Sequence, residues 1–267
     1  MIFLLYGYGN HSNRLFQSIH FEAFCLENNI GFKNLAFDDM YPLYDCGEIS
    51  CRRWRIVRWG LDFVRKVLDK TGIRCLCFLD YNKLASQVNP PRTCVVWGWN
   101  FRRGDLTKKY RNVFKEKYAL KSEFYMNNSF VSAFEKNRNN SICIGMHIRK
   151  GDYKEFLDGK YYYTDEQYFS VLKNVVDLLK CNCTDKKIYV YIFSNEDVAD
   201  LFYSVPNVSV SKENWYIDQY LMSKMDYLFG PPSTFTSWAS YIGDVPLYFM
   251  ENPEVNVTME DFRIIDG

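Results

Sequence analysis

The second half of the chain alternates two patterns of apolar residues. The segments at 141–148 (SICIGMHI) and 187–194 (KIYVYIFS) are apolar at almost every position, which is typical of parallel strands buried on both faces. Between them, residues 164–180 place apolar side chains three and four positions apart behind a capping box, T-D-E-Q, and this predicts an amphipathic helix. Further strands are expected at 207–211, 226–230 and 246–250, with helices at 216–225 and 233–243. The alternation predicts a Rossmann-like α/β domain.

The first half predicts a second α/β domain. A short apolar run at 1–7 precedes an amphipathic segment at 13–29, which indicates a strand followed by a helix. The polar stretch at 135–141 separates the halves, so we place an N-terminal domain at 1–140 and a C-terminal domain at 141–267. We expect the two Rossmann-like halves to face a cleft, with ligands outside the carboxyl ends of the strands.

Composition narrows the class of protein. The 267 residues are 48% hydrophobic and carry a formal net charge of +1, so no overall field favours nucleic acid. The opening apolar run reads as a strand rather than a signal peptide, and no run reaches the length of a membrane span. Nine cysteines, an odd number, suit free thiols in a reducing, cytoplasmic compartment. The C-x-C pairs at 75–77 and 181–183 lack zinc-finger spacing and are expected to be core thiols.

One predicted strand ends in a concentration of charge, C-I-G-M-H-I-R-K-G-D-Y. In an extended chain His147 and Arg149 point to the same side, while the residues between them point into the core. The planar guanidinium of arginine suits a phosphate group, and Gly151 permits a sharp turn that lets Asp152 brace Arg149. The alternative is an ordinary surface salt bridge between Arg149 and Asp152.

Two further strand ends carry polar groups. The segment 230–234 (GPPST) lies between a strand and a helix, where hydroxyls and free amides can hold a phosphate. Ser233 alone is explained as a helix cap, but together with Arg149 on a neighbouring strand it predicts a pyrophosphate held from two sides. The segment 194–196 (SNE) could read a base or a ribose, although capping explains its serine and Asp197 equally well.

Four segments resemble glycosyltransferase family 11, the α-1,2-fucosyltransferases, in the order in which that family has them. HIRKGDY at 147–153 is similar to the motif H-x-R-x-G-D-Y, whose arginine engages the pyrophosphate of GDP-fucose. IFSNE at 192–196 and the run 218–243, which begins DQYLMS and contains STFTSW, resemble two later segments. WGWNF at 97–101 is similar to the stretch G-Y-[WF]-Q, so the resemblance covers nearly the whole chain.

The resemblance implies a GT-B-like fold and inverting transfer of L-fucose from GDP-fucose to a glycan hydroxyl, without a metal or another cofactor. The sequence contains no D-x-D triplet, the carboxylate pattern that commonly holds a metal on a diphosphate. The implied donor contacts come from His147, Arg149, Ser194, Asn195, Glu196, Ser233, Thr234 and Phe235. The candidate catalytic residues are Arg149, which the resemblance implies, and the nearby carboxylates of Asp152 and Glu155. The candidate acceptor side includes Asn10, Asn13, Arg14 and Tyr153.

Several roles stay open. The family's opening G-G-L-G-N-Q-[LM]-F-Q is replaced by YGYGNHSNRLFQ, so either Asn10 or Asn13 fits its asparagine, and Lys150 stands where a second arginine is common. His147 could bind the nucleotide, orient Arg149, or be a satisfied core histidine. The donor could instead be GDP-rhamnose or GDP-mannose, and a binding module without turnover is a further alternative. Three carboxylates are candidates for the base: Asp152, Glu155 and Asp158.

The segment 52–74 interleaves arginine and lysine with Trp54, Trp59, Leu61 and Phe63. A basic amphipathic helix of this kind can lie on an anionic membrane surface, so peripheral membrane contact is one expectation. A solvated basic face above a packed face is the other. Nucleic-acid binding is not expected, because the aromatic residues have the helical spacing that packing requires.

Overall fold

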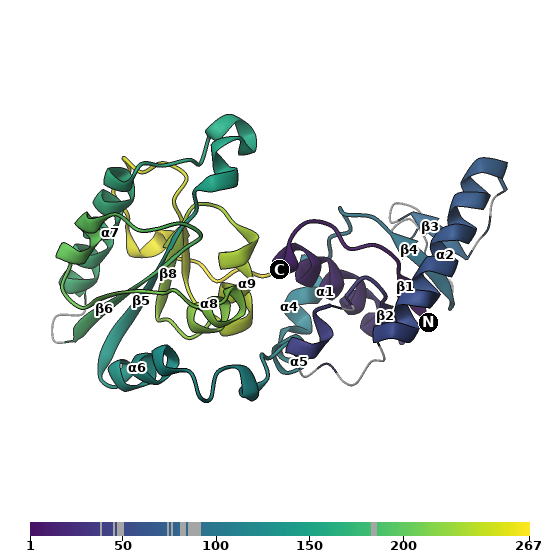
Figure 1. Ribbon diagram of the computed structural model, residues 1–267, viewed down its shortest axis with the longest axis horizontal. Helices are drawn as coiled ribbons and strands as arrows, with labels where there is room; N and C mark the ends of the chain where they lie inside the picture. The colour runs from purple at the N-terminus through teal and green to yellow at the C-terminus, as the bar shows by residue number, and fades with distance from the viewer. Residues whose placement is uncertain are drawn as a thin grey trace. The chain divides into compact units, whose positions relative to one another are not determined.

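The computed structural model describes residues 1–37, 39–44, 46, 51–73, 75, 77–80, 84, 92–182 and 186–267, with the backbone alone for residues 51–53. Contacts divide the chain into two compact units (Figure 1), and each unit contains a parallel sheet with helices packed against it. The first unit is Met1–Lys121 with Asp266–Gly267, and the second is Ser122–Ile265. No helix in the described ranges combines the length and the hydropathy of a transmembrane span.

The first unit is a four-stranded parallel sheet in the order β2-β1-β4-β3. Its strands are β1 (Ile2–Leu4), β2 (Phe32–Asn34), β3 (Phe78–Asp80) and β4 (Cys94–Trp97). Its α-helices are α1 (His11–Glu27), α2 (Cys51–Thr71), α4 (Gly104–Lys109) and α5 (Arg111–Lys117). The chain end returns to this unit, because Asp266 accepts hydrogen bonds from Lys108 at 3.0 Å and Arg111 at 2.9 Å.

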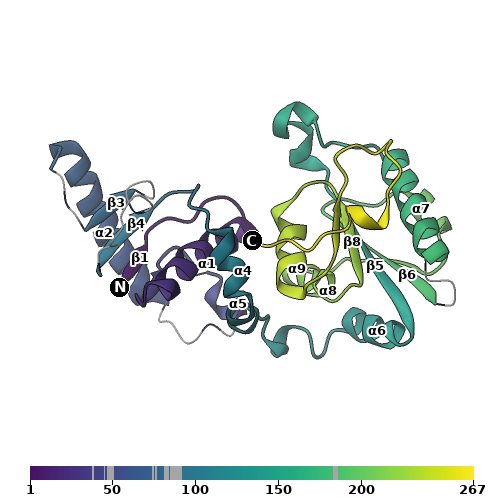
Figure 2. The same ribbon diagram turned by 180° about the vertical axis from the view of Figure 1, so that it is seen from behind.

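The second unit is a five-stranded parallel sheet in the order β7-β6-β5-β8-β9. Its strands are β5 (Ser141–Ile148), β6 (Lys187–Ser194), β7 (Val208–Val210), β8 (Tyr227–Gly230) and β9 (Leu247–Phe249). Its α-helices are α6 (Ser129–Arg138), α7 (Asp165–Asn182), α8 (Trp215–Met222) and α9 (Thr234–Gly243). Figures 1 and 2 show α7 on one side of the sheet and α8 and α9 on the other. The strands and helices predicted for this half are confirmed.

The central strand β5 is buried along its whole length, as its apolar sequence predicts. Ile144, Met146 and Ile148 join the core that the sheet shares with α7. Gly145 faces the other side, where a Cβ atom would lie 2.6 Å from Leu228 Cδ2. The predicted alternation is therefore confirmed, and the close packing at Gly145 leaves no room for a side chain.

The division between the two units lies before the predicted boundary at 140/141. The contacts divide the chain between Lys121 and Ser122, because α6 packs on the second sheet. The ring of Phe134 in α6 lies 5.2 Å from the ring of Tyr191 in β6, and the two are nearly perpendicular at 78°. The polar stretch at 135–141 therefore covers the end of α6 and the turn that leads into β5, and does not separate domains.

Two helical glycines should respond oppositely to substitution by alanine. A Cβ atom at Gly243, where α9 ends, would lie 2.1 Å from the backbone oxygen of Ser223, so we expect Gly243→Ala to cost about 1 to 3 kcal/mol. Gly60 in α2 has no atom within 4 Å of such a Cβ, so Gly60→Ala should be neutral or stabilising by up to about 1 kcal/mol. Urea midpoints from circular dichroism measure both, and an unchanged midpoint for Gly243→Ala would contradict the packing of α9 described here.

Candidate active site

Three of the predicted polar segments meet at one edge of the five-stranded sheet. The strands β6, β5 and β8 are neighbours and parallel, so the segments that follow them emerge at the same, carboxyl edge. These segments are 149–153 after β5, 194–196 around the end of β6, and 231–235 at the start of α9. Carboxyl edges of parallel sheets are the usual position of ligand sites in α/β folds.

The segments after β5 and β6 contact each other directly. The backbone N–H of Lys150 donates to Asn195 Oδ1 at 3.1 Å. Gly151 has a φ of 56°, and a Cβ atom there would lie 3.0 Å from Asn195 Nδ2. Both its conformation and its close approach therefore favour glycine. Ser194 Oγ accepts the backbone N–H of Glu196 at 3.1 Å, in agreement with the capping alternative.

The segments after β5 and β8 are also joined. Tyr153 is buried in the 3-10 helix η3 (Gly151–Lys154), and its hydroxyl donates to the carbonyl oxygen of Pro232 at 2.5 Å. Ser233 caps α9 by accepting the N–H of Phe235 at 3.2 Å, and Thr234 begins the helix. Tyr153, which the resemblance assigned to the acceptor side, thus lies in the second unit, where its hydroxyl connects two loops.

His147 is buried with an unsatisfied nitrogen. Only 4% of the residue is exposed, its ring lies 5.4 Å from the ring of Phe235, and Nδ1 has no hydrogen-bond partner among the described residues. Burial, together with the nearby charge of Arg149, lowers the pKa of His147 to about 3, so the ring is neutral at pH 7. The geometry does not fit a satisfied core histidine, because a buried unpaired polar atom is costly.

Arg149 is fixed at several points and still has an unsatisfied atom. Its Nη2 donates to Asp152 Oδ2 at 2.8 Å, and its guanidinium carbon lies 5.6 Å from the centre of the Tyr153 ring. The hydroxyl of Tyr168 bonds both its backbone N–H and its carbonyl oxygen, each at 3.2 Å. Nε is buried and unpartnered within the described part of the chain. The predicted salt bridge is therefore present, and it does not use all of the donors of the guanidinium.

The other carboxylates near Arg149 are exposed. The side chain of Asp152 is 59% exposed, and Glu155 lies at the exposed end of η3. Asp158, in the 3-10 helix η4 (Phe156–Gly159), is also exposed and has a φ of 56°. Lys150 Nζ is held by Asp165 Oδ1 at 2.6 Å, at the start of α7. Lys150 is therefore engaged by an acid of α7, whereas Arg149 keeps an unpaired Nε.

Asp218 is a buried acid that the sequence reasoning missed. It lies in α8, is 9% exposed, and accepts a hydrogen bond from Ser211 Oγ at 2.5 Å. Ser211 directly follows β7, so the pair belongs to the same edge of the sheet as the segments above. Burial raises the pKa of Asp218 to about 7, and the nearby Glu213 adds to this. Its one signal in the sequence was its position at the start of the 218–243 segment.

The other predicted acceptor-side residues lie around the start of α1 in the first unit. Asn10 is the exposed N-cap residue, although its side chain makes no cap hydrogen bond. Gly9 has a φ of 67°, and a Cβ atom there would approach the side chain of Asn13 closely, so this position favours glycine. Arg14 Nη2 bonds both carboxylate oxygens of Asp39, at 2.9 and 2.8 Å.

Gln17 is a further buried polar residue in this region. It is 1% exposed, and its Nε2 donates to the carbonyl oxygens of Tyr6 at 3.0 Å and Gly98 at 2.9 Å. These carbonyls follow β1 and β4, so the side chain joins two neighbouring strand ends. Its Oε1 has no partner in the described residues. The acceptor-side role was predicted for the asparagines of this motif and not for this glutamine.

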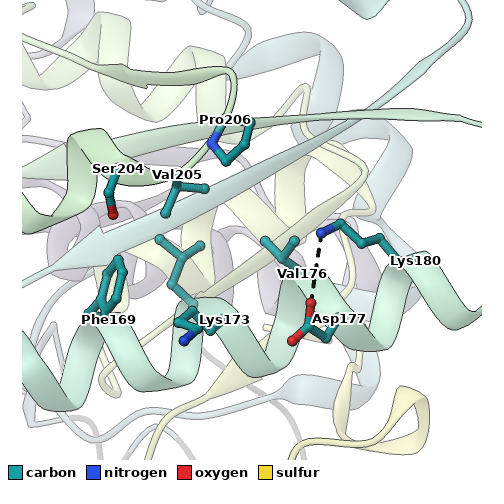
Figure 3. Close-up of a pocket in the computed structure, with 9 residues that line it drawn as sticks. Phe169, Lys173, Val176, Asp177, Lys180, Ser204, Val205 and Pro206 are labelled. Carbon is teal, nitrogen blue, oxygen red and sulfur yellow. Dashed lines mark ion pairs between the residues drawn. The ribbon is translucent and has the colours of Figure 1, made fainter.

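A pocket of about 270 Å³ lies elsewhere in the second unit, beside α7 and the segment that leads into β7 (Figure 3). The side chains around it are mostly apolar, and one ion pair joins Asp177 to Lys180 at 3.8 Å. It contains none of the predicted site residues. The lining residues are Phe169, Leu172, Lys173, Val176, Asp177, Lys180, Ser204, Val205 and Pro206.

Two cysteines of the C-x-C pairs are exposed. Cys75, Cys77 and Cys181 are free thiols, and the prediction of core thiols is wrong for Cys77 and Cys181, because both are exposed. Cys183 lies outside the described residues. Over the described ranges, no group of three or more His, Cys, Asp or Glu side chains is placed to hold a metal ion.

Comparison with known proteins identifies the fold class. No protein-family model matches the sequence, and no curated protein matches it. Solved structures do match, and they confirm the predicted class: α/β, GT-B-like, with two Rossmann-like units.

The similar structures are fucosyltransferases. NodZ α-1,6-fucosyltransferase soaked with GDP-fucose matches with a TM-score of 0.64, 13% identity, and coverage of 95% of this chain and 97% of that chain. NodZ from Bradyrhizobium matches with a TM-score of 0.63, 13% identity, and coverage of 95% and 96%. A variant of Arabidopsis thaliana FUT1 in complex with GDP matches with a TM-score of 0.62, 10% identity, and coverage of 98% and 72%. At these identities the likeness establishes a shared fold.

The buried acid gives a pH-dependent prediction. The unfolded chain releases the Asp218 proton near pH 4 and the folded chain near pH 7, so this group lowers stability as the pH rises between those values. Asp218→Asn keeps an oxygen for Ser211 and removes the titration. We expect the variant to gain about 2 kcal/mol relative to the native chain between pH 5 and pH 8. Urea unfolding at both pH values measures this gain.

The exposed Asp177→Asn, on α7 in the same unit, is the control and should change stability equally at both pH values. A difference between native and Asp218→Asn proteins that is equal at pH 5 and pH 8 would contradict a proton held by Asp218.

Proposed function

We propose that this protein is an inverting, metal-independent fucosyltransferase that uses GDP-fucose as its donor. The observation that carries the proposal is a pair of buried, unsatisfied nitrogens, His147 Nδ1 and Arg149 Nε, at the carboxyl edge of the second sheet. They belong to the H-x-R-x-G-D-Y segment, and the fold is shared with structures described as containing GDP or GDP-fucose. A sugar-nucleotide donor that supplies hydrogen-bond partners to both atoms would remove the cost of leaving them unpaired.

In this proposal the diphosphate lies between Arg149 and the N-terminus of α9. The guanidinium offers charge-assisted hydrogen bonds, and Ser233 and Thr234 stand at the positive end of the helix dipole. The neutral ring of His147 can accept or donate a hydrogen bond to the nucleotide without adding to the positive charge. Support for the placement of Ser194, Asn195 and Glu196 near the donor comes from their contacts with the Arg149 segment.

The proposed reaction breaks the bond between fucose C1 and the β-phosphate oxygen. The acceptor oxygen forms its bond to C1 from the opposite face, and its proton passes to a carboxylate. Arg149 would stabilise the negative charge that grows on the departing GDP. Asp152 is engaged with this guanidinium, which favours a positioning role. The exposed Glu155 and Asp158 remain as candidates, and we propose Glu155 as the base. The acceptor is proposed to bind the first unit near Asn10, Asn13 and Arg14.

The finer assignments rest on the sequence. The resemblance to family 11 supports an α-1,2 linkage, whereas one of the similar structures is described as an α-1,6-fucosyltransferase. A cytoplasmic location is supported by the free cysteines of the described residues. Linkage analysis of the product distinguishes the two linkages.

Nucleotide binding should depend on Arg149. In EDTA, GDP at a hundred times its dissociation constant should stabilise the native chain by about 2.7 kcal/mol, which a thermal-shift assay detects, while UDP should have little effect. Arg149→Ala should lose most of this stabilisation. Arg138→Ala removes an exposed arginine on α6 and should keep it. If Arg149→Ala responds to GDP as the native chain does, the pyrophosphate assignment is wrong.

Turnover should also depend on the shape of the guanidinium. We expect GDP release from GDP-fucose at equal rates in EDTA and in magnesium, with a loss of roughly 100- to 1,000-fold in Arg149→Ala. Arg149→Lys keeps the charge but loses the planar fork, so its rate of GDP release should lie between those of the native chain and Arg149→Ala. Chromatography of released GDP gives the rates. If GDP-fucose binds but no GDP is released, with or without glycan acceptors, the protein is a binding module. If GDP is released faster from another GDP-sugar, that sugar nucleotide is the donor.

A further inference from the structure

The helix α2 uses one face to pack on the first unit. Trp54 and Leu61 lie against the small core cluster of the four-stranded sheet, which contains Leu5 and Val95. Arg65, one turn after Leu61, donates from Nε to the hydroxyl of Tyr6 at 2.5 Å. These contacts fix which side of the helix faces the protein, and so determine which side faces away from it.

The opposite face of α2 carries a second apolar stripe. Ile56, Trp59, Phe63 and Val67 follow one another at three- and four-residue spacing and are 65%, 68%, 68% and 42% exposed. Gly60 lies on this side, and a Cβ atom added to it would have no neighbour within 4 Å. Figures 1 and 2 both show α2 at the outside of the first unit. We define the outer stripe as Ile56, Trp59, Phe63 and Val67.

The same helix concentrates positive charge. Its 21 residues include seven arginines and lysines and two aspartates, so it carries a net charge of +5, whereas the whole chain carries +1. Asp62 pairs with Lys66 at 2.7 Å, and Asp69 pairs with Arg65 at 2.5 Å, so both acids are already engaged. Lys66 and Lys70, three residues after Phe63 and Val67, are exposed beside or in line with the outer stripe.

We propose that α2 binds the surface of a membrane that contains anionic lipids. The outer stripe would enter the boundary between headgroups and acyl chains, and the flanking lysines and arginines would contact the phosphates. Charge decides between this occupant and a second copy of the chain, because two helices with a charge of +5 would repel each other across a symmetric interface. An anionic surface instead complements both the apolar stripe and the charge.

Vesicle flotation tests the proposal with the purified full chain. Vesicles of phosphatidylcholine with about one third phosphatidylglycerol should carry the protein, whereas pure phosphatidylcholine should carry about tenfold less, as should the anionic vesicles in high salt. Ile56→Ser/Phe63→Ser should lower binding to anionic vesicles by at least about tenfold. Met126→Ser/Val255→Ser removes two similarly exposed apolar side chains, 68% and 51%, from the second unit and should leave binding unchanged.

The charge contribution has its own matched pair of variants. Lys66→Gln/Lys70→Gln should weaken binding to anionic vesicles several-fold, whereas Lys173→Gln/Lys180→Gln, exposed on α7, should not. The substituted positions are exposed, and equal unfolding midpoints will show that the variants are folded. Failure of the native chain to float with anionic vesicles, or equal flotation of Ile56→Ser/Phe63→Ser, overturns the proposal. So does a dimer in lipid-free solution that Ile56→Ser/Phe63→Ser dissociates, because the outer stripe would then be an interface between copies.

Discussion

The parallel pairing of β5 with β6 and β8 is the interaction on which the candidate site depends. The register sets Ile148 opposite Ser194 and Met146 opposite Phe229, so three strands end close together. Hydrogen bonds from Lys150 to Asn195 and from Tyr153 to the β8 loop then hold the emerging segments. A slip of one residue in β5 would turn His147 into the core beneath α7 and place an isoleucine in the site. Burial of both faces of the strand makes that slip costly.

The same edge of the sheet retains polar atoms that the fold does not satisfy. His147 Nδ1 and Arg149 Nε each cost about 1 to 3 kcal/mol if they remain unpaired. The rings of Phe235 and Tyr153 lie beside them, and a hydrogen bond made with a ligand in such apolar surroundings is stronger than one made in water. The unpaired atoms therefore lower the stability of the free protein at the place where the proposed sugar nucleotide would bind. Asp218, after β7, differs in having a partner, Ser211, and burial raises its pKa to about 7.

The spacing of apolar residues and the types of polar residue at the strand ends made the second unit predictable from the sequence. Continuous apolar runs located β5 and β6, and strand alternation placed His147 and Arg149 on one side. The boundary could not be predicted in this way, because a polar turn between α6 and β5 resembles a linker until the contact of Phe134 with the sheet is known. The pairing of Asp218 with Ser211 was equally hidden, since it depends on the packing of α8 and not on spacing. The sequence thus predicted the helices and strands of this unit better than the contacts between them.

The helix α2 shows why one amphipathic pattern gave two interpretations. Trp54 and Leu61, seven residues apart, face the sheet, whereas Trp59 and Phe63, four apart, face outward. Trp54 and Trp59 are five positions apart, so they point about 140° away from each other around the helix axis. A helix on the surface of a globular domain needs one apolar face, and the aromatic residues of α2 supply two. The inner face explains the folding of the first unit, so the outer face has to be explained by something the unit meets.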